Sequence, residues 1–201
     1  MDDETLGALA SISVATITMQ LLKRGIRNIS MAGVRPLNTP AEPILGPAFT
    51  LRYVPLREDL STPDKLGGDD YPPRLAIEQA PEGGVLVIDG RGRGDIAVVG
   101  DLLVERLKIR GVVGVVSDGG VRDCEDALAV GLALYASGPA APASVAVSRS
   151  YTASTPRSRS HGPRRDTCSD AATRPCFATM PTRWTVMRVD EGGTRRCPSA
   201  R

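Results

Sequence analysis

The chain has 201 residues, enough for one domain with its own core, and it has so few aromatic residues (2 Phe, 4 Tyr and 1 Trp) that this core must consist of Val, Leu, Ile and Ala. Its net charge of +2 is unevenly distributed. Residues 1–147 have 14 basic and 19 acidic side chains, a net charge of −5, whereas residues 148–201 have 11 basic and 4 acidic side chains, a net charge of +7. No apolar run reaches the ~18 residues of a membrane span and the acidic start lacks the pattern of a secretory signal, so we expect a cytoplasmic protein without a membrane partner.

The cysteines do not form a zinc-binding pattern. Cys124, Cys168, Cys176 and Cys197 include no C-x-x-C pair, and His161 is the one histidine of the sequence. Structural zinc sites usually combine such closely spaced pairs. We therefore expect no metal–thiolate site, and a reducing compartment is the default.

The first third of the chain predicts a helix, a loop and a strand. Apolar residues recur with helical spacing over residues 5–28, where Gly25 marks the end or a break. Six Gly and Pro residues within 30–47 predict a loop with short extended pieces. Residues 48–54 alternate apolar and polar side chains, as a half-buried strand does. A polar loop over residues 55–73 follows, and loops of that length are usually functional or flexible.

Helices and strands alternate from there to residue 135. The expected elements are a helix over 74–79, a strand over 85–89, an extended segment over 96–99, a helix over 102–110, a strand over 112–116, a helix over 124–130 and a strand over 132–135. The apolar runs at 85–89 and 112–116 are typical of strands covered on both faces. This order predicts an α/β domain.

A glycine-rich turn, Gly90 to Gly94, follows the strand over 85–89. It spells G-x-G-x-G, not the G-x-G-x-x-G of dinucleotide sites. We interpret it as a tight turn that needs positive φ angles.

Asp101 stands at the start of the helix over 102–110. As an N-cap, its carboxylate would accept hydrogen bonds from backbone amides of the first turn. The same amides, at the positive end of the helix dipole, can instead hold a substrate carboxylate. Both interpretations stay open for this residue taken alone.

Arg122 and Asp123 follow the strand over 112–116. Ligands of open α/β sheets gather beyond the carboxyl ends of strands. Arginine can clamp a carboxylate with two hydrogen bonds, and aspartate is a hard oxygen ligand for Mg²⁺ or Mn²⁺. A surface ion pair, or Asp123 capping the helix over 124–130, would explain either residue singly. Together with Asp101 at the previous strand end, they favour a functional site.

The spacing of Asp101, twenty residues and then Arg122-Asp123 resembles the D-x20-R-D motif of the class II aldolases for 4-hydroxy-4-methyl-2-oxoglutarate and 4-carboxy-4-hydroxy-2-oxoadipate. These aldolases share the fold of the regulator of ribonuclease activity A. Further similar segments are Gly33–Leu37, Ile44–Leu51, Val85–Asp89 and Gly111–Val116. The resemblance covers roughly residues 10–147 and implies a single α/β domain, 1–147, with the RraA-like β/β/α swivelling-domain fold.

By that resemblance, Asp123 holds a divalent cation, Mg²⁺ or Mn²⁺, directly or through water, and Arg122 binds the pyruvate end of a 2-oxo acid substrate. The backbone amides that would hold the substrate carboxylate are those of Gly100, Asp101, Leu102 and Leu103. Asp101 would also act as the acid/base through a metal-bound water. The implied reaction cleaves 4-hydroxy-4-methyl-2-oxoglutarate-type substrates to pyruvate, and oxaloacetate decarboxylation passes through the same enolate. A homotrimer or hexamer is implied as well.

Two other functions stay open. Relatives that regulate ribonuclease share the fold but lack the full acidic motif, so the alternative is a non-catalytic protein that binds and inhibits a ribonuclease. The third is a nucleic-acid binder that uses the basic tail, but this tail has no interleaved aromatic residues and no recognisable module. The presence of both Asp101 and Asp123 favours the enzyme.

Residues 148–201 differ in composition from the rest of the chain. Arg, Ser, Thr and Pro dominate, and Ile, Leu and Lys are missing, which predicts a disordered tail. Read in a shifted codon frame, residues 172–184 can encode a segment that resembles the family's closing Gly-Asp … Asp-x-Asp-Gly-Val-Val, so we interpret the tail as a frameshift product. In the aldolases this segment leads to an acidic group in the neighbouring subunit's metal site, so its loss would impair metal binding and assembly. Sequencing the gene near Ser148 tests this interpretation.

Overall fold

The computed structural model describes residues 3–27, 29, 31–40, 43–55, 71–144, 148–152, 178–180 and 184–186. Most of the loop predicted over 55–73 and most of the tail predicted over 148–201 lie outside the described residues. His161, Cys168, Cys176 and Cys197 lie outside them entirely.

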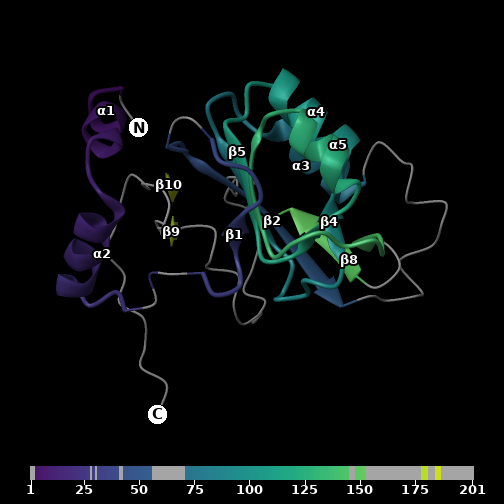
Figure 1. The fold of residues 1–201 in the computed structure, drawn as a ribbon, viewed down its shortest axis with the longest axis horizontal. Helices are drawn as coiled ribbons and strands as arrows, with labels where there is room; N and C mark the ends of the chain where they lie inside the picture. Colours follow the sequence, from purple (N-terminus) through teal and green to yellow (C-terminus); the bar gives the residue numbers. More distant parts are fainter. Residues whose placement is uncertain are drawn as a thin grey trace, which may run out of the picture.

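A six-stranded mixed sheet forms the centre of the described structure (Figure 1). Its strands, in spatial order, are β1 (Arg35–Pro36), β7 (Ala133–Ala136), β5 (Gly114–Ser117), β3 (Val85–Asp89), β2 (Ala48–Pro55) and β8 (Ser148–Thr152). The four inner strands run parallel, and β1 and β8 pair antiparallel at the two edges. The α/β prediction is confirmed, and the predicted strands over 48–54, 85–89, 112–116 and 132–135 all occur with small shifts at their ends.

Apolar side chains cover both faces of this sheet. Along β3, Val85 and Val87 belong to one apolar cluster, whereas Leu86 and Ile88 belong to the other. This alternation follows from the two-residue period of a strand. It confirms that this apolar run is a strand buried on both faces.

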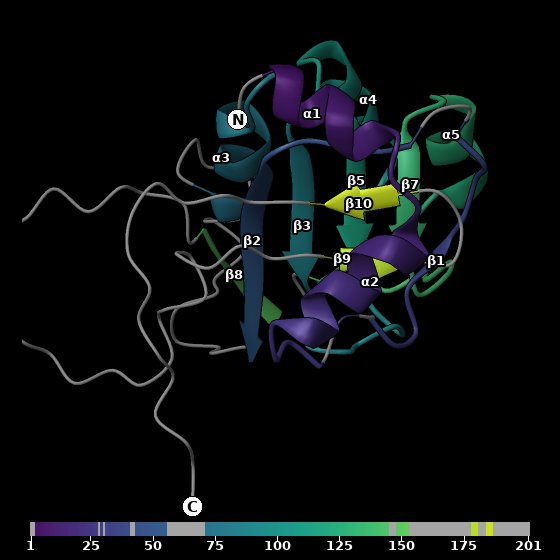
Figure 2. The ribbon, with the colours of Figure 1, turned by 90° about the vertical axis from the view of Figure 1, so that its left-hand side faces the viewer.

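Helices lie on both sides of the sheet. On one side lie α3 (Pro72–Gln79), α4 (Asp101–Ile109) and α5 (Cys124–Ala129), which bury Ala76, Val104, Leu107 and Ala127 in the same cluster as Leu86 and Ile88. On the other side lie α1 (Asp3–Ala10) and α2 (Val14–Lys23), together with the hairpin of β9 (Ala178–Met180) and β10 (Trp184–Val186), as Figure 2 shows.

The prediction of one helix over residues 5–28 is wrong, because α1 and α2 are separate helices bent by 108°. The Ser13 side chain caps α2 by accepting a hydrogen bond from the Thr16 amide at 3.2 Å, and such local bonds compete with helix continuation. Gly25, with φ 82°, ends α2 as predicted. Among the described residues no single helix could span a membrane by length and composition; α1 and α2 meet that test only as this bent pair.

A second, smaller sheet places the start of α4. It pairs β4 (Ala97–Val99) in parallel with β6 (Gly120–Val121). Strand β4 leads directly into α4, and β6 leads into Arg122. The small sheet therefore sets two segments of the predicted motif beside each other.

The proposed division of the chain at residue 147 stays a prediction. Strand β8 begins at the next residue and pairs with β2 in a continuous register, from Leu51 opposite Thr152 to Pro55 opposite Ser148.

Candidate active site

Two strand ends bring the distant parts of the motif together. Val99 pairs with Val121, and the Arg122 amide donates to the Val99 carbonyl at 2.9 Å. A Cβ atom built on Gly100 would lie 3.7 Å from Asp123 Oδ2 and 3.8 Å from Arg122 Nε. The N-terminus of α4 and the Arg122-Asp123 pair thus form one corner of the molecule, which we call the Asp123 corner.

Gly100, and not Asp101, is the N-cap of α4. Its backbone is extended, with φ −134° and ψ 178°, and no side chain caps the helix. The interpretation of Asp101 as an N-cap is therefore wrong, because Asp101 is already the first helical residue. The amides of an uncapped first turn remain suited to an external anion.

The four predicted amides of this cradle are not equivalent. The Leu103 amide donates to the Gly100 carbonyl at 3.1 Å, in the tight turn that opens the helix. The amides of Asp101 and Leu102 are consequently the better donors for a substrate carboxylate. Leu102 is 69% exposed, so this first turn faces the surface.

Arg122 and Asp123 form an ion pair. Arg122 Nε donates to Asp123 Oδ2 at 2.7 Å, and the two side chains are 49% and 43% exposed. Asp123 has φ 50° and ψ 50°, a left-handed conformation that is strained for a residue other than glycine. It stands at the N-cap position of α5, but its side chain makes no capping hydrogen bond. Of the two structural interpretations, the ion pair is confirmed, and the helix cap is confirmed in position but has no side-chain hydrogen bond.

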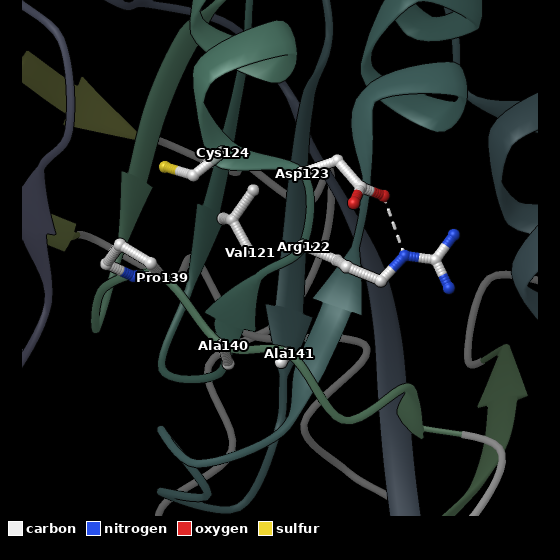
Figure 3. Close-up of a pocket in the computed structure, with 7 residues that line it drawn as sticks. All are labelled: Val121, Arg122, Asp123, Cys124, Pro139, Ala140 and Ala141. Atoms are coloured by element: carbon white, nitrogen blue, oxygen red, sulfur yellow. Dashed lines mark hydrogen bonds and ion pairs between the residues drawn. The ribbon is translucent and has the colours of Figure 1, made fainter.

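An open pocket of about 380 Å³ includes this pair, as Figure 3 shows. Its lining residues are Val121, Arg122, Asp123, Cys124, Pro139, Ala140 and Ala141. The side chains of Arg122 and Asp123 extend to the same side, and the Cys124 sulfur points away from them.

Sequence reasoning missed the wall formed by residues 139–141. Backbone hydrogen bonds hold this wall against β6: the Val121 amide donates to the Gly138 carbonyl at 2.9 Å, and the Ala140 amide donates to the Val121 carbonyl at 2.9 Å. Small apolar residues in a loop carry no recognisable motif. Nothing local in the sequence could have placed them here.

The donors at this corner fit a hydrated hard cation better than zinc. No group of three or more His, Cys, Asp or Glu side chains converges within the part of the chain that the structure describes. Mg²⁺ needs no such group, because proteins usually bind it through one or two carboxylates while waters and substrate oxygens complete its shell. Asp123 would supply one such carboxylate.

A second corner, at Asp118, is built differently. Asp118 Oδ1 accepts from the Gly90 amide at 2.5 Å, and Oδ2 accepts from the Gly92 amide at 2.7 Å. Arg91 and Gly92 have φ angles of 63° and 70°, which confirms the interpretation of this stretch as a tight turn with positive φ. Both Asp118 oxygens are thereby engaged with backbone.

The buried residue Tyr53 holds β4 in place through a hydrogen bond. This residue is only 2% exposed, and its hydroxyl donates to the Val98 carbonyl at 3.1 Å while accepting from Ser144 Oγ at 3.3 Å. Burial raises the pKa of Tyr53 far above its ordinary value. The hydroxyl stays neutral and holds the strand that delivers Gly100.

Comparison with known proteins shows the family to which this chain belongs. The RraA-like family, described as Aldolase/RraA, matches residues 10–154. The chain is 28% identical over 120 residues to the "Putative 4-hydroxy-4-methyl-2-oxoglutarate aldolase" of Halalkalibacterium halodurans, covering 60% of this chain and 50% of that protein. It is 29% identical over 133 residues to protein DlpA of Legionella pneumophila, covering 66% of this chain and 20% of that protein. The chain thus spans half, or less, of these two relatives.

A solved structure is also similar. The crystal structure of Streptomyces coelicolor RraAS2, an unusual member of the RNase ES inhibitor RraA protein family, superposes with a TM-score of 0.65 at 28% identity. The match covers 76% of this chain and 71% of that one.

Proposed function

We propose that this chain, which belongs to the RraA-like (Aldolase/RraA) family, is a carbon–carbon lyase that releases pyruvate from 4-hydroxy-4-methyl-2-oxoglutarate-type substrates. The observation that carries the proposal is the Asp123 corner. There, a Cβ atom added to Gly100, the residue that opens the uncapped helix α4, would lie within 4 Å of Arg122 and Asp123, which belong to a segment about twenty residues away. The aldolase relative supports the same activity at 28% identity.

The substrate is held by complementary charge. The Arg122 guanidinium binds the carboxylate and 2-oxo oxygens at the pyruvate end, and its half-exposed position lets it reach into the pocket. The amides of Asp101 and Leu102 bind a substrate carboxylate at the positive end of α4. Two anchors fix the bond to be broken between them.

Asp101 is proposed to move the proton. Its carboxylate takes the proton of the 4-hydroxyl group, directly or through water, as the C3–C4 bond breaks, and the proton returns to C3 of pyruvate. Mg²⁺ or Mn²⁺ held by Asp123 would stabilise the negative charge that develops on the pyruvate oxygen. Oxaloacetate develops the same charge when it loses CO₂, so oxaloacetate decarboxylation is proposed as a second activity. We also propose that the protein is a cytoplasmic homotrimer or hexamer.

The test is pyruvate release with Mg²⁺, with Mn²⁺ and with EDTA. Asp123→Asn should lower kcat/KM at least ~100-fold if this carboxylate stabilises the transition state. Asp95→Asn is the matched control, since Asp95 is also an exposed aspartate paired with a neighbouring arginine. Because the tail is interpreted as a frameshift product, both the printed chain and a frame-restored chain should be assayed. Full activity of Asp123→Asn, or no pyruvate from either chain, would contradict the proposal.

A second candidate function is inhibition of a ribonuclease without catalysis. Similarity to the Streptomyces coelicolor RraA protein favours it. A pull-down against ribonuclease ES in EDTA separates the two functions. Binding that persists both without metal and in Asp123→Asn indicates the inhibitor.

A further inference from the structure

The hydrogen bond between Arg122 and Asp123 joins the two groups to which the proposed function gives different ligands. Arg122 is assigned to a substrate carboxylate and Asp123 to a cation, yet the two side chains meet at 2.7 Å. A cation that uses Asp123 Oδ2 therefore competes with Arg122 for the same oxygen.

The ion pair between Arg122 and Asp123 is weak enough for either side chain to exchange its partner for a ligand. Within the described residues, one hydrogen bond joins Arg122 to Asp123, whereas Arg93–Asp95 and Arg106–Glu78 are each closed by two at 2.8 Å. Two-point pairs are the stronger ones, and exposed ion pairs contribute little to stability. Both partners are nearly half-exposed, so either can turn to a ligand at small cost.

Charge balance makes the exchange cooperative. A cation beside a released guanidinium places two positive groups in one corner, which is unfavourable. A substrate carboxylate on Arg122 neutralises that excess, so each ligand favours the other, and by linkage the effect is reciprocal.

We propose that Arg122 is an internal competitor for the cation position on Asp123: cation binding releases the Arg122 guanidinium, and the released guanidinium then captures the substrate carboxylate. This inference rests on the proposed function, but its test needs no turnover.

The test follows the Nε–H resonance of Arg122 by NMR in full-length protein during a saturating Mg²⁺ titration, with Arg122→Lys used for assignment. We expect Mg²⁺ to shift this resonance and EDTA to restore it. In Asp123→Asn the resonance should begin at a new position and stay there. Arg93, in its two-point pair with Asp95, is the internal reference that should not move, and Glu125→Gln, which removes one acidic charge two residues away, should keep the response.

A second measurement gives the size of the competition. Arg122→Gln should bind Mn²⁺ roughly fivefold more tightly than the unmodified protein, the ratio expected for removal of one exposed ion pair. Arg93→Gln should leave the Mn²⁺ affinity unchanged. An unmoved Arg122 resonance at saturating Mg²⁺, no gain in affinity in Arg122→Gln, or no cation binding at all would overturn the inference. A shifted resonance without pyruvate release would contradict the proposed function and leave the exchange between the cation and Arg122 at Asp123 intact.

Discussion

The Asp118 corner and the Asp123 corner use the same residue types in different ways. Each follows a buried strand, and each combines an aspartate, a nearby glycine and a left-handed residue, which is Arg91 at the first corner and the aspartate itself, Asp123, at the second. At the first corner, both carboxylate oxygens of Asp118 accept from backbone amides. At the second, Asp123 accepts from a half-exposed side chain, and the nearby helix amides have no side-chain cap.

The difference separates a structural acid from a ligand-binding one. Backbone amides cannot leave their position without unfolding the turn, so Asp118 is committed to the fold. A guanidinium on a flexible stem can leave, so Asp123 remains available to a ligand. The hydrogen-bond donor that pairs with a carboxylate therefore indicates the function of that carboxylate better than its position after a strand does.

The largest expected effect comes from exchanging each aspartate for asparagine. Asp118→Asn should lower the free energy of unfolding by about 2 kcal/mol, because one of two amides loses its acceptor and the other loses a charged partner. Asp123→Asn should cost less than about 1 kcal/mol, as expected for an exposed ion pair. Urea denaturation measures both, and equal losses at the two positions would erase the distinction between the corners.

Replacing one glycine by alanine at each corner should give a smaller difference in stability loss between the corners. A Cβ at Gly90 would lie 3.1 Å from Asp118 Oδ1 and from the Gly119 backbone, so Gly90→Ala should cost about 1–2 kcal/mol. At Gly100 the nearest atom is 3.7 Å away and φ is −134°, so Gly100→Ala should cost about 0.5 kcal/mol at the N-cap. Thermal denaturation checks stability. A KM that rises only in Gly100→Ala would place the ligand at α4.

Tyr53→Phe tests how β4 is held in place. Loss of its hydrogen bond to Val98 should cost about 1 kcal/mol at neutral pH. Because burial raises the folded-state pKa of Tyr53 above the ordinary 10.0, its contribution is fully present below pH 10.0 and is lost as pH rises further. Tyr53→Phe should therefore show a weaker loss of stability in alkaline buffer, measured as Tm against pH. An unchanged alkaline profile would contradict this assignment.

The smallest effect concerns the anchoring of α4 to α3. The hydrogen bond from Arg106 holds the pKa of Glu78 below its ordinary 4.5, so this contribution is present above pH 4.5 and is lost as pH falls through the lower folded-state value. Glu78→Gln should flatten the acid side of the Tm profile and leave pyruvate release at neutral pH unchanged. A loss of activity at neutral pH would instead connect Glu78 to the site.

Much of the fold was predictable because the signals are local. Val85–Asp89 matches its prediction residue for residue, since a short apolar run that ends in an aspartate between two turns has few other solutions. The 108° bend before Val14 was not predicted, because apolar spacing continues across it and only the Ser13 cap interrupts the helix. The two-residue strand β6 is too short to show any period.

The chain itself determined the order of its strands and helices, its two-sided core and the presence of Asp101, Arg122 and Asp123 at strand ends, because burial and turn chemistry act over a few residues. Tertiary structure alone decided that β4 pairs with β6, that Gly100 caps α4, and that Asp123 meets Arg122 while Asp118 meets backbone amides. The pairing of β4 with β6 and the hydrogen bonds of Asp118 depend on contacts between segments about twenty to thirty residues apart, and their geometry is set by packing, which no local pattern encodes.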